Sequence, residues 1–292
     1  MPDNVRVPGR LGRLPALIPA GLRDLTSYAA GPLPQAPASM PAPAVADWGV
    51  LGNDTYGNCG VCGIEHGLMA AAADTGEAEQ FPAAQDCVSY YLAYDGGQDN
   101  GVVLSQFLAY VRANGYYGHA VQAYAPVAVQ DVPTLKFATW AYDFAYLGIR
   151  VTQAMMDAFT AGQPWTAATA QGDTLGGHCV PAVGYDDQYL TVVTWGKLQQ
   201  VAWPAWHAIG EEAWALICGE QAAAKSDGHG LSLAALQADL SRLAVPIPPP
   251  PAPAPPAPEG LLAELAAFCR HVAASADRDI ADVIAWLRQR GL

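Results

Sequence analysis

Two cysteines lie in an unusual local sequence, just before a predicted helix. They form the pair Cys59-Gly-Val-Cys62, which follows the turn-rich stretch LGNDTYGN and leads into a helical pattern over about 61–73. A thiol at a helix N-terminus, with an imidazolium beside it, has a lowered pKa and is a nucleophile at neutral pH. His178 lies far downstream, on a predicted strand. This combination of residues predicts acyl transfer through a cysteine nucleophile and a histidine base.

The same residues also allow a metal site. Cys59, Cys62 and His66 have the spacing C-x2-C-x3-H, and His178 could supply a fourth ligand. Structural zinc sites usually add a second CxxC or a closely spaced His pair, and the sequence has neither. The Gly-rich segments TLGGH and YDGGQDNG lack phosphate-loop spacing. We therefore predict no metal and no other cofactor.

The sequence around His178 resembles papain-like cysteine peptidases. HCVPAVGY at 178–185, followed by a hairpin and by Trp195-Gly196, is similar to the histidine strand and Trp-Gly turn of that family. Residues 10–220, with RLGRLPA, GNDTYGNC and VVTWGKL, also look like uncharacterised papain-fold proteins of bacteria and tailed phages. The resemblance implies a cysteine at the start of the first helix and an oxyanion-hole amide six residues before it. Asn53 precedes Cys59 by six residues.

The resemblance leaves two candidates for the nucleophile. Aligning CGVC with the CGSCW segment of papain relatives selects Cys62 and makes Cys59 a disulfide partner. The residue six positions before Cys62 is then Tyr56, which has no carboxamide. Choosing Cys59 instead places Asn53 in the oxyanion hole. We prefer Cys59, and we expect Cys59 and Cys62 to remain unbridged because the compartment is predicted to be reducing.

The third member of the triad departs from the family pattern. The asparagine of papain relatives falls on Val193, which cannot orient an imidazole by hydrogen bonding. Asp186 or Asp187 in the hairpin turn could take that role from another direction, although both fit ordinary turn residues. Thr194 is next along the strand and is expected to point to the opposite face. Trp195 is expected to shield the imidazole. The site is therefore a dyad, a rewired triad or a relic.

The elements that would position these residues follow a simple order. We predict helices first, then a strand-like region with alternating aromatic residues, a short helix, a hairpin of two strands joined by DDQ, and a last helix. Their approximate ranges are 61–73, 85–94 and 104–114 for the helices, 136–151 for the strand-like region, 155–161, 178–195 for the hairpin and 203–216. This order predicts an α+β domain of two segregated layers, and the resemblance implies that its fold is papain-like.

Composition divides the chain into four parts. Residues 1–46 are rich in Pro and Ala and are predicted to be an extended arm that lies on the main domain or on a partner. Residues 47–243 are the papain-like domain, and 244–260 are a polyproline linker. Residues 261–292 have apolar spacing typical of two short amphipathic helices, which are too small to form a core alone. We expect this tail to dock on another protein or to self-associate.

Charge and hydropathy exclude several classes of function. With 14 basic and 27 acidic residues the net charge is −13, so neither nucleic-acid nor membrane binding is expected. No apolar run is long enough to span a bilayer, and the first residues lack a signal-peptide pattern, which predicts a cytoplasmic or, from the phage resemblance, virion-associated protein. The predicted function is a cysteine hydrolase acting on a peptide or amide. The alternative is a catalytically inactive papain-fold module in a phage particle or another assembly.

Overall fold

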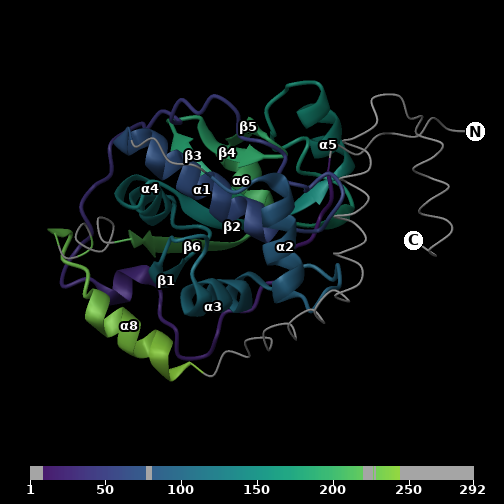
Figure 1. Ribbon diagram of the computed structural model, residues 1–292. Helices are drawn as coiled ribbons and strands as arrows, with labels where there is room; N and C mark the ends of the chain where they lie inside the picture. Colours follow the sequence, from purple (N-terminus) through teal and green to yellow (C-terminus); the bar gives the residue numbers. More distant parts are fainter. Residues whose placement is uncertain (1–8, 77–80, 220–225, 227, 244–292) are drawn as a thin grey trace, which may run out of the picture. The chain divides into compact units, whose positions relative to one another are not determined.

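The fold is built on one antiparallel sheet in the first compact unit of the chain, as seen in a computed structural model (Figure 1). The structure describes residues 9–76, 81–219, 226 and 228–243. The predicted linker at 244–260 and the predicted helical tail at 261–292 lie outside the described residues. The six strands follow the spatial order β1-β6-β2-β3-β4-β5, and each neighbouring pair is antiparallel. They are β1 (Val121–Val127), β2 (Ala145–Thr152), β3 (Thr174–Tyr185), β4 (Tyr189–Thr194), β5 (Lys197–Ala202) and β6 (Gly210–Cys218).

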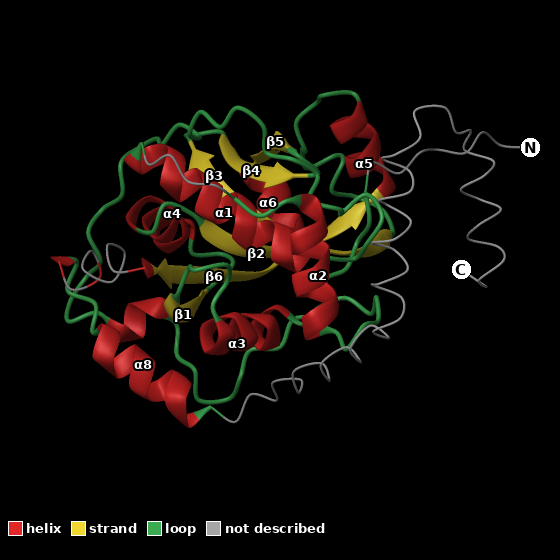
Figure 2. Cartoon of the chain, viewed as in Figure 1, coloured by secondary structure: helices red, strands yellow, loops and turns green. Residues whose placement is uncertain are grey.

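Helices pack against this sheet to give a mixed α+β architecture (Figure 2). They are the 3-10 helix η1 (Leu25–Tyr28) and the α-helices α1 (Cys59–Thr75), α2 (Ala84–Tyr94), α3 (Leu104–Asn114), α4 (Val132–Ala141), α5 (Gln153–Thr160), α6 (Trp203–Ile209) and α8 (Leu233–Arg242). Within the described residues, no helix is both long and apolar enough to cross a membrane.

Helix α1 approaches the sheet closely because glycine recurs on its inner face. A Cβ atom at Gly63 would lie 2.8 Å from the Tyr146 ring of β2 and 3.0 Å from Sγ of Cys179 in β3. A Cβ at Gly67 would lie 2.4 Å from the Phe144 ring, just before β2. Any larger side chain at these two positions would push the helix away from β2 and β3. The N-terminus of α1 is therefore held against the strand that carries His178.

The hairpin of β3 and β4 and the first three helices are confirmed, but two predicted elements are wrong in part. The strand-like region 136–151 begins as α4 and becomes β2 only at Ala145. Helix α4 starts there because Asp131 caps it, accepting a hydrogen bond from the Thr134 backbone at 3.1 Å, and because Pro133 suits a first helical turn. The alternating aromatic residues of that region therefore span two elements, so their spacing does not reflect one strand.

The predicted helix over 203–216 is also two elements. Helix α6 ends at Ile209, and Gly210 begins β6. Strand β6 pairs with β1 on one side and with β2 on the other, and all residues from Glu212 to Ile217 are buried. A strand covered on both faces has a continuous apolar run rather than an alternating pattern. Such a run cannot be told from a buried helix by periodicity alone.

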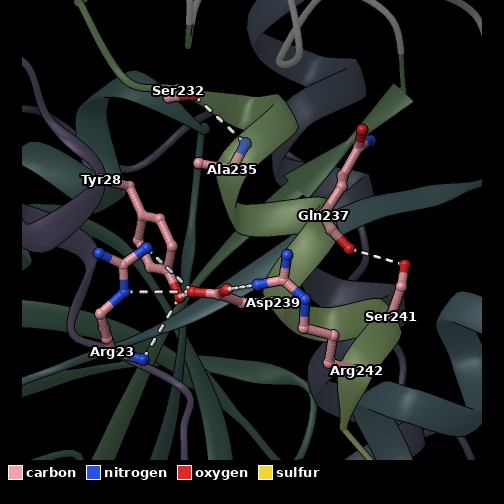
Figure 3. Close-up of polar contacts among 8 residues, drawn as sticks. All are labelled: Arg23, Tyr28, Ser232, Ala235, Gln237, Asp239, Ser241 and Arg242. Carbon is pink, nitrogen blue, oxygen red and sulfur yellow. Dashed lines mark hydrogen bonds and ion pairs between the residues drawn. The ribbon is translucent and has the colours of Figure 1, made fainter.

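One of the places where the arm contacts the domain is helix α8. Leu22, Leu25 and Tyr28 are buried in the hydrophobic core. Beside them, Oδ2 of Asp239 in α8 accepts hydrogen bonds from Nη2 of Arg23 at 2.9 Å and from the Tyr28 hydroxyl at 3.0 Å (Figure 3). Nε of Arg23 also donates to Oδ2 at 3.1 Å, and Nη1 of Arg242 donates to Oδ1 at 3.1 Å. One carboxylate of α8 therefore holds η1 and the residues just before it.

Candidate active site

Cys59 is the first residue of α1 and is fully buried. The preceding turn is fixed by Asn58, whose Nδ2 donates to the Leu51 carbonyl at 2.8 Å. Burial raises the pKa of the Cys59 thiol to about 11, although hydrogen bonds from the backbone of Cys179, Gly12 and Gly60 and the charge of Arg13 oppose that rise. The sulfur therefore lies where three backbone segments meet: the helix N-terminus, β3 and the N-terminal arm.

His178 is buried on β3, and its ring is fixed by two neighbours. Its Nε2 lies 2.8 Å from Oγ1 of Thr194 at the end of β4. The Trp195 ring stacks on the imidazole, with centroids 4.6 Å apart and planes inclined by 20°. Nδ1 is buried and has no hydrogen-bond partner among the described residues. Nδ1 is thus the ring nitrogen left available for a proton from a thiol or a substrate.

Cys59 begins α1 and His178 lies on β3, and these two elements pack against each other. Cys179 directly follows His178, and its backbone hydrogen-bonds the Cys59 sulfur. Burial, with a smaller contribution from the charge of His66, lowers the pKa of His178 to about 3. In this arrangement both groups are neutral, so the lowered thiol pKa expected from the helix N-terminus is not found. Burial outweighs the helix dipole because desolvation disfavours the charged thiolate.

The group that orients His178 is Thr194, and the expectation that its side chain points away from the histidine is wrong. Strand β4 ends at Thr194, and the chain then turns through Trp195 and Gly196, both of which have positive φ angles, +44° and +75°. The pairing of β4 with β5 stays in register through Thr194, which pairs with Lys197, so Thr194 and Val193 face opposite sides of the strand, and His178 lies on the side of Thr194. Val193 is buried and pairs with Leu198 of β5, so it has no polar role.

Neither of the two aspartates in the hairpin turn orients His178. Oδ1 of Asp186 accepts hydrogen bonds from the backbone of Gln188 and Tyr189, both at 2.7 Å. Asp187 is exposed at the tip of the hairpin. Neither carboxylate therefore acts as a third member beside His178.

Asn53 is buried, and its carboxamide already holds peptide carbonyl groups. Its Nδ2 donates to the carbonyl of Arg10 at 3.2 Å and to that of Tyr56 at 3.0 Å. The Asn53 carbonyl in turn accepts from the Arg10 backbone N–H at 2.6 Å. Asn53 thus binds one residue of the arm through both its backbone and its side chain. An amide that can hold the carbonyl of Arg10 has the chemistry that an oxyanion hole requires.

Cys62 lies one turn into α1 and is a poorer candidate for the nucleophile. It is buried with its sulfur near the carbonyls of Val50 and Leu51, at 3.9 and 3.8 Å. Burial, followed by the charges of neighbouring acidic groups, raises its pKa well above the ordinary value. Carbonyl oxygens around a sulfur further disfavour a thiolate. Cys59 and Cys62 are both free thiols.

His66 is turned away from a metal-binding arrangement. Its Nε2 lies 2.9 Å from the Trp48 carbonyl and 3.0 Å from that of Gly49, so the ring donates to backbone oxygens. Burial lowers the pKa of His66 to about 4. No three His, Cys, Asp or Glu side chains converge as metal ligands within the part of the chain that the structure describes.

The arm passes directly over the Cys59 thiol, which sequence reasoning did not foresee. The Arg13 backbone N–H donates to the Gly177 carbonyl at 3.0 Å, on the β3 side. On the helical side, the Val102 N–H donates to the Gly12 carbonyl at 2.7 Å, and the Leu14 N–H donates to the Val102 carbonyl at 2.8 Å. These bonds make Gly12–Leu14 a strand-like segment between the two walls. The motif RLGRLPA was the only sequence signal, and nothing in it indicates where the segment binds.

Comparison with known proteins supports the fold of this site. No protein-family model and no curated protein matches the sequence. Among solved structures, the chain is similar to xylellain, a cysteine protease from Xylella fastidiosa, with a TM-score of 0.52 and 13% sequence identity. The match covers 74% of this chain and 98% of xylellain. At this identity the likeness shows the fold alone: the chain has a fold similar to that of this cysteine protease.

Proposed function

We propose that the chain is a cysteine hydrolase that cleaves a peptide or amide bond with Cys59 as nucleophile and His178 as general base. The observation that carries this proposal is the set of contacts around His178. Thr194 hydrogen-bonds Nε2, Trp195 stacks on the ring, and Nδ1 has no hydrogen-bond partner among the described residues. A structural histidine buried in a core would be expected to have both nitrogens satisfied. An imidazole held at one nitrogen and free at the other is what proton shuttling requires.

The remaining groups take roles that follow from their contacts. Thr194 forms a hydrogen bond with Nε2 of His178 and fixes the orientation of the ring. It would therefore take the role of the asparagine of papain relatives, whose position is occupied here by Val193. Asn53, with the backbone N–H of Cys59, would hold the oxyanion of the tetrahedral intermediate. In the reaction, the Cys59 sulfur attacks the carbonyl carbon, His178 takes the thiol proton and returns it to the leaving amine, and water then releases the acyl group.

The arm must leave the cleft before this reaction can occur. Gly12 hydrogen-bonds the sulfur, and Arg10 occupies the Asn53 carboxamide. The described arrangement is therefore a closed resting state with a neutral thiol. Displacement of the arm would admit water and substrate, and both would lower the pKa of the thiol.

The test is alkylation of Cys59 by iodoacetamide, combined with hydrolysis of a peptide library. We expect slow labelling of the intact chain and fast labelling once the arm is displaced. The fast labelling should be lost in His178→Ala, and Cys59→Ser should abolish hydrolysis. Labelling at the rate of an ordinary thiol in the displaced state, unchanged by His178→Ala, would favour the inactive binding module.

Docking through residues 261–292, and a phage or virion role, stay predictions.

A further inference from the structure

A pair of carboxylates at the start of β6 holds a guanidinium group that belongs to the chain itself. Nε of Arg13 lies 2.8 Å from Oε1 of Glu212, and Nη1 of Arg13 contacts Oε2 of Glu211. The Arg13 side chain is 2% exposed and that of Glu212 is fully buried, whereas Glu211 lies at the open edge, 42% exposed. We call these two glutamates, with Gly148 and Gly177 beside them, the acidic pocket.

The acidic pocket is built independently of its occupant. Oε2 of Glu212 accepts a hydrogen bond from Nε1 of Trp214 at 2.8 Å, so Trp214 fixes the carboxylate with or without Arg13. The space for the guanidinium exists because Gly148 has no side chain: a Cβ there would lie 2.6 Å from Nε of Arg13. A cavity of about 470 Å³, lined in part by Arg13, Thr174 and Glu211, opens alongside.

Arg13 fills the pocket incompletely. Its Nη2 is buried and has no hydrogen-bond partner among the described residues. Buried donors in a permanent structural ion pair are normally all satisfied, because an unmet donor is unfavourable. Because one donor of Arg13 is unsatisfied, the guanidinium group of an arginine in a bound peptide could replace it.

The main chain around Arg13 is bound as a peptide ligand would be. Its backbone pairs with Gly177 of β3 on one side, and its neighbours pair with Val102 on the other. Such pairing is independent of side-chain identity, so specificity in an extended peptide comes from the side-chain pockets. Arg13 follows Gly12, which packs against Gly57, two residues before Cys59. The acidic pocket therefore lies close to the turn that leads into Cys59.

We propose that the acidic pocket is a specificity site for an arginine side chain of an extended peptide substrate, and that Arg13 occupies it in the resting chain. This proposal rests on the hydrolase function proposed above. The charge of Glu211 and Glu212 selects a cation, and the fork formed by the two carboxylates suits the planar guanidinium better than an ammonium.

A thermal-shift experiment tests the pocket without any need for catalysis. The full chain carrying Arg13→Ala is heated with about 10 mM Nα-acetyl-arginine amide or with its neutral isostere, Nα-acetyl-citrulline amide. We expect the arginine amide to raise the melting temperature of the variant by about 2–5 °C and the citrulline amide to leave it unchanged. The intact chain, whose pocket is filled, should respond to neither. Adding Glu212→Gln to Arg13→Ala should remove the response.

Arg13→Ala leaves buried carboxylates unpaired, so its folding is measured as well. If the variant does not fold alone, recovery on refolding with the arginine amide but not with the citrulline amide supports the pocket. Recovery with neither compound, while the Arg13→Ala/Glu211→Gln/Glu212→Gln chain folds, overturns it.

Peptide hydrolysis by Arg13→Ala then separates this proposal from the proposed function. We expect at least about a 10-fold higher kcat/KM for arginine than for citrulline at the pocket position, lost on Glu212→Gln. Hydrolysis with no such preference and no thermal response overturns the arginine site and keeps the hydrolase. A thermal response without hydrolysis of any peptide keeps the guanidinium pocket and overturns the hydrolase.

Discussion

Two arginines anchor the arm, and they do so in opposite surroundings. Arg13 is buried against Glu212 beside Cys59, whereas Arg23 is half exposed where it meets Asp239 on α8. Burial raises the pKa of Glu212 above its ordinary value despite the nearby Arg13, while the hydrogen bond from Arg23 lowers that of Asp239. The two anchors therefore hold the arm with different strengths, and the buried one is the stronger.

Removing the buried anchor should have the largest effect. Arg13→Ala leaves Glu212 buried and uncompensated, and breaking a buried ion pair in this way costs about 3–5 kcal/mol of unfolding free energy. Urea unfolding would measure it. Arg13→Ala combined with Glu212→Gln should recover part of the loss, because the buried charge is gone. A loss within error of zero for Arg13→Ala would mean that water already reaches Glu212.

Displacing the arm while keeping Arg13 should change the chemistry of Cys59. A Cβ at Gly12 would lie 1.8 Å from the Gly57 carbonyl oxygen, so Gly12→Ala cannot keep the arm in place. We expect the pKa of Cys59 to fall from about 11 to below that of an ordinary thiol, because water and His178 can then stabilise the thiolate. Iodoacetamide labelling at pH 7 should then rise by more than about 100-fold, in proportion to the thiolate.

Gly31→Ala is the matched control for this variant. Gly31 is also in the arm, but a Cβ there would meet nothing within 4 Å. Its labelling rate should match that of the unmodified chain. A folded Gly12→Ala chain, judged by circular dichroism, that labels no faster than Gly31→Ala would contradict the closed resting state.

Thr194→Val tests whether Thr194 orients His178 for catalysis. It removes the hydrogen bond to Nε2 of His178 and should lower kcat by about 10-fold, the effect expected when a buried polar group loses its partner. Because His178 gains freedom, the pH dependence of kcat should also shift. Thr194→Ser, which keeps the hydroxyl, should restore both. An unshifted pH profile in Thr194→Val would leave Thr194 with a purely structural role.

The exposed anchor should give the smallest effect. Arg23→Ala should lower the melting temperature much less than Arg13→Ala does, and about 1 M salt should remove most of that difference by screening. The pair stabilises the fold above the ordinary Asp pKa of 3.8, and this contribution is lost as the pH falls through the lower folded pKa of Asp239. Melting curves from pH 7 to about pH 2 would show it. A salt-independent loss equal to that of Arg13→Ala would contradict the comparison.

The sequence alone was enough to predict the helices and the hairpin whose patterns are local. The turn before Cys59, the helix that follows it and the strand of His178 are each specified by neighbours in sequence: the Gly-rich turn, an apolar helical run and a β-branched run. The overall α+β class follows from their order, and the solved structure of xylellain supports that class. The assignment of Cys59, His178 and Asn53 as catalytic residues is our proposal.

Only the tertiary structure decided what lies around these residues. Thr194 reaches His178 because the face of β4 that carries Thr194 is the one against which His178 lies, and a pattern of alternation does not say which face meets the histidine. The region 203–216 divides at Gly210 because β6 is enclosed between two other strands, and burial on both faces erases its periodicity. The partners Arg13 and Glu212 are 199 residues apart, so neither residue type nor spacing could pair them. Burial sets the pKa of Cys59, and burial is a property of the packed arm and strand rather than of the sequence near the thiol.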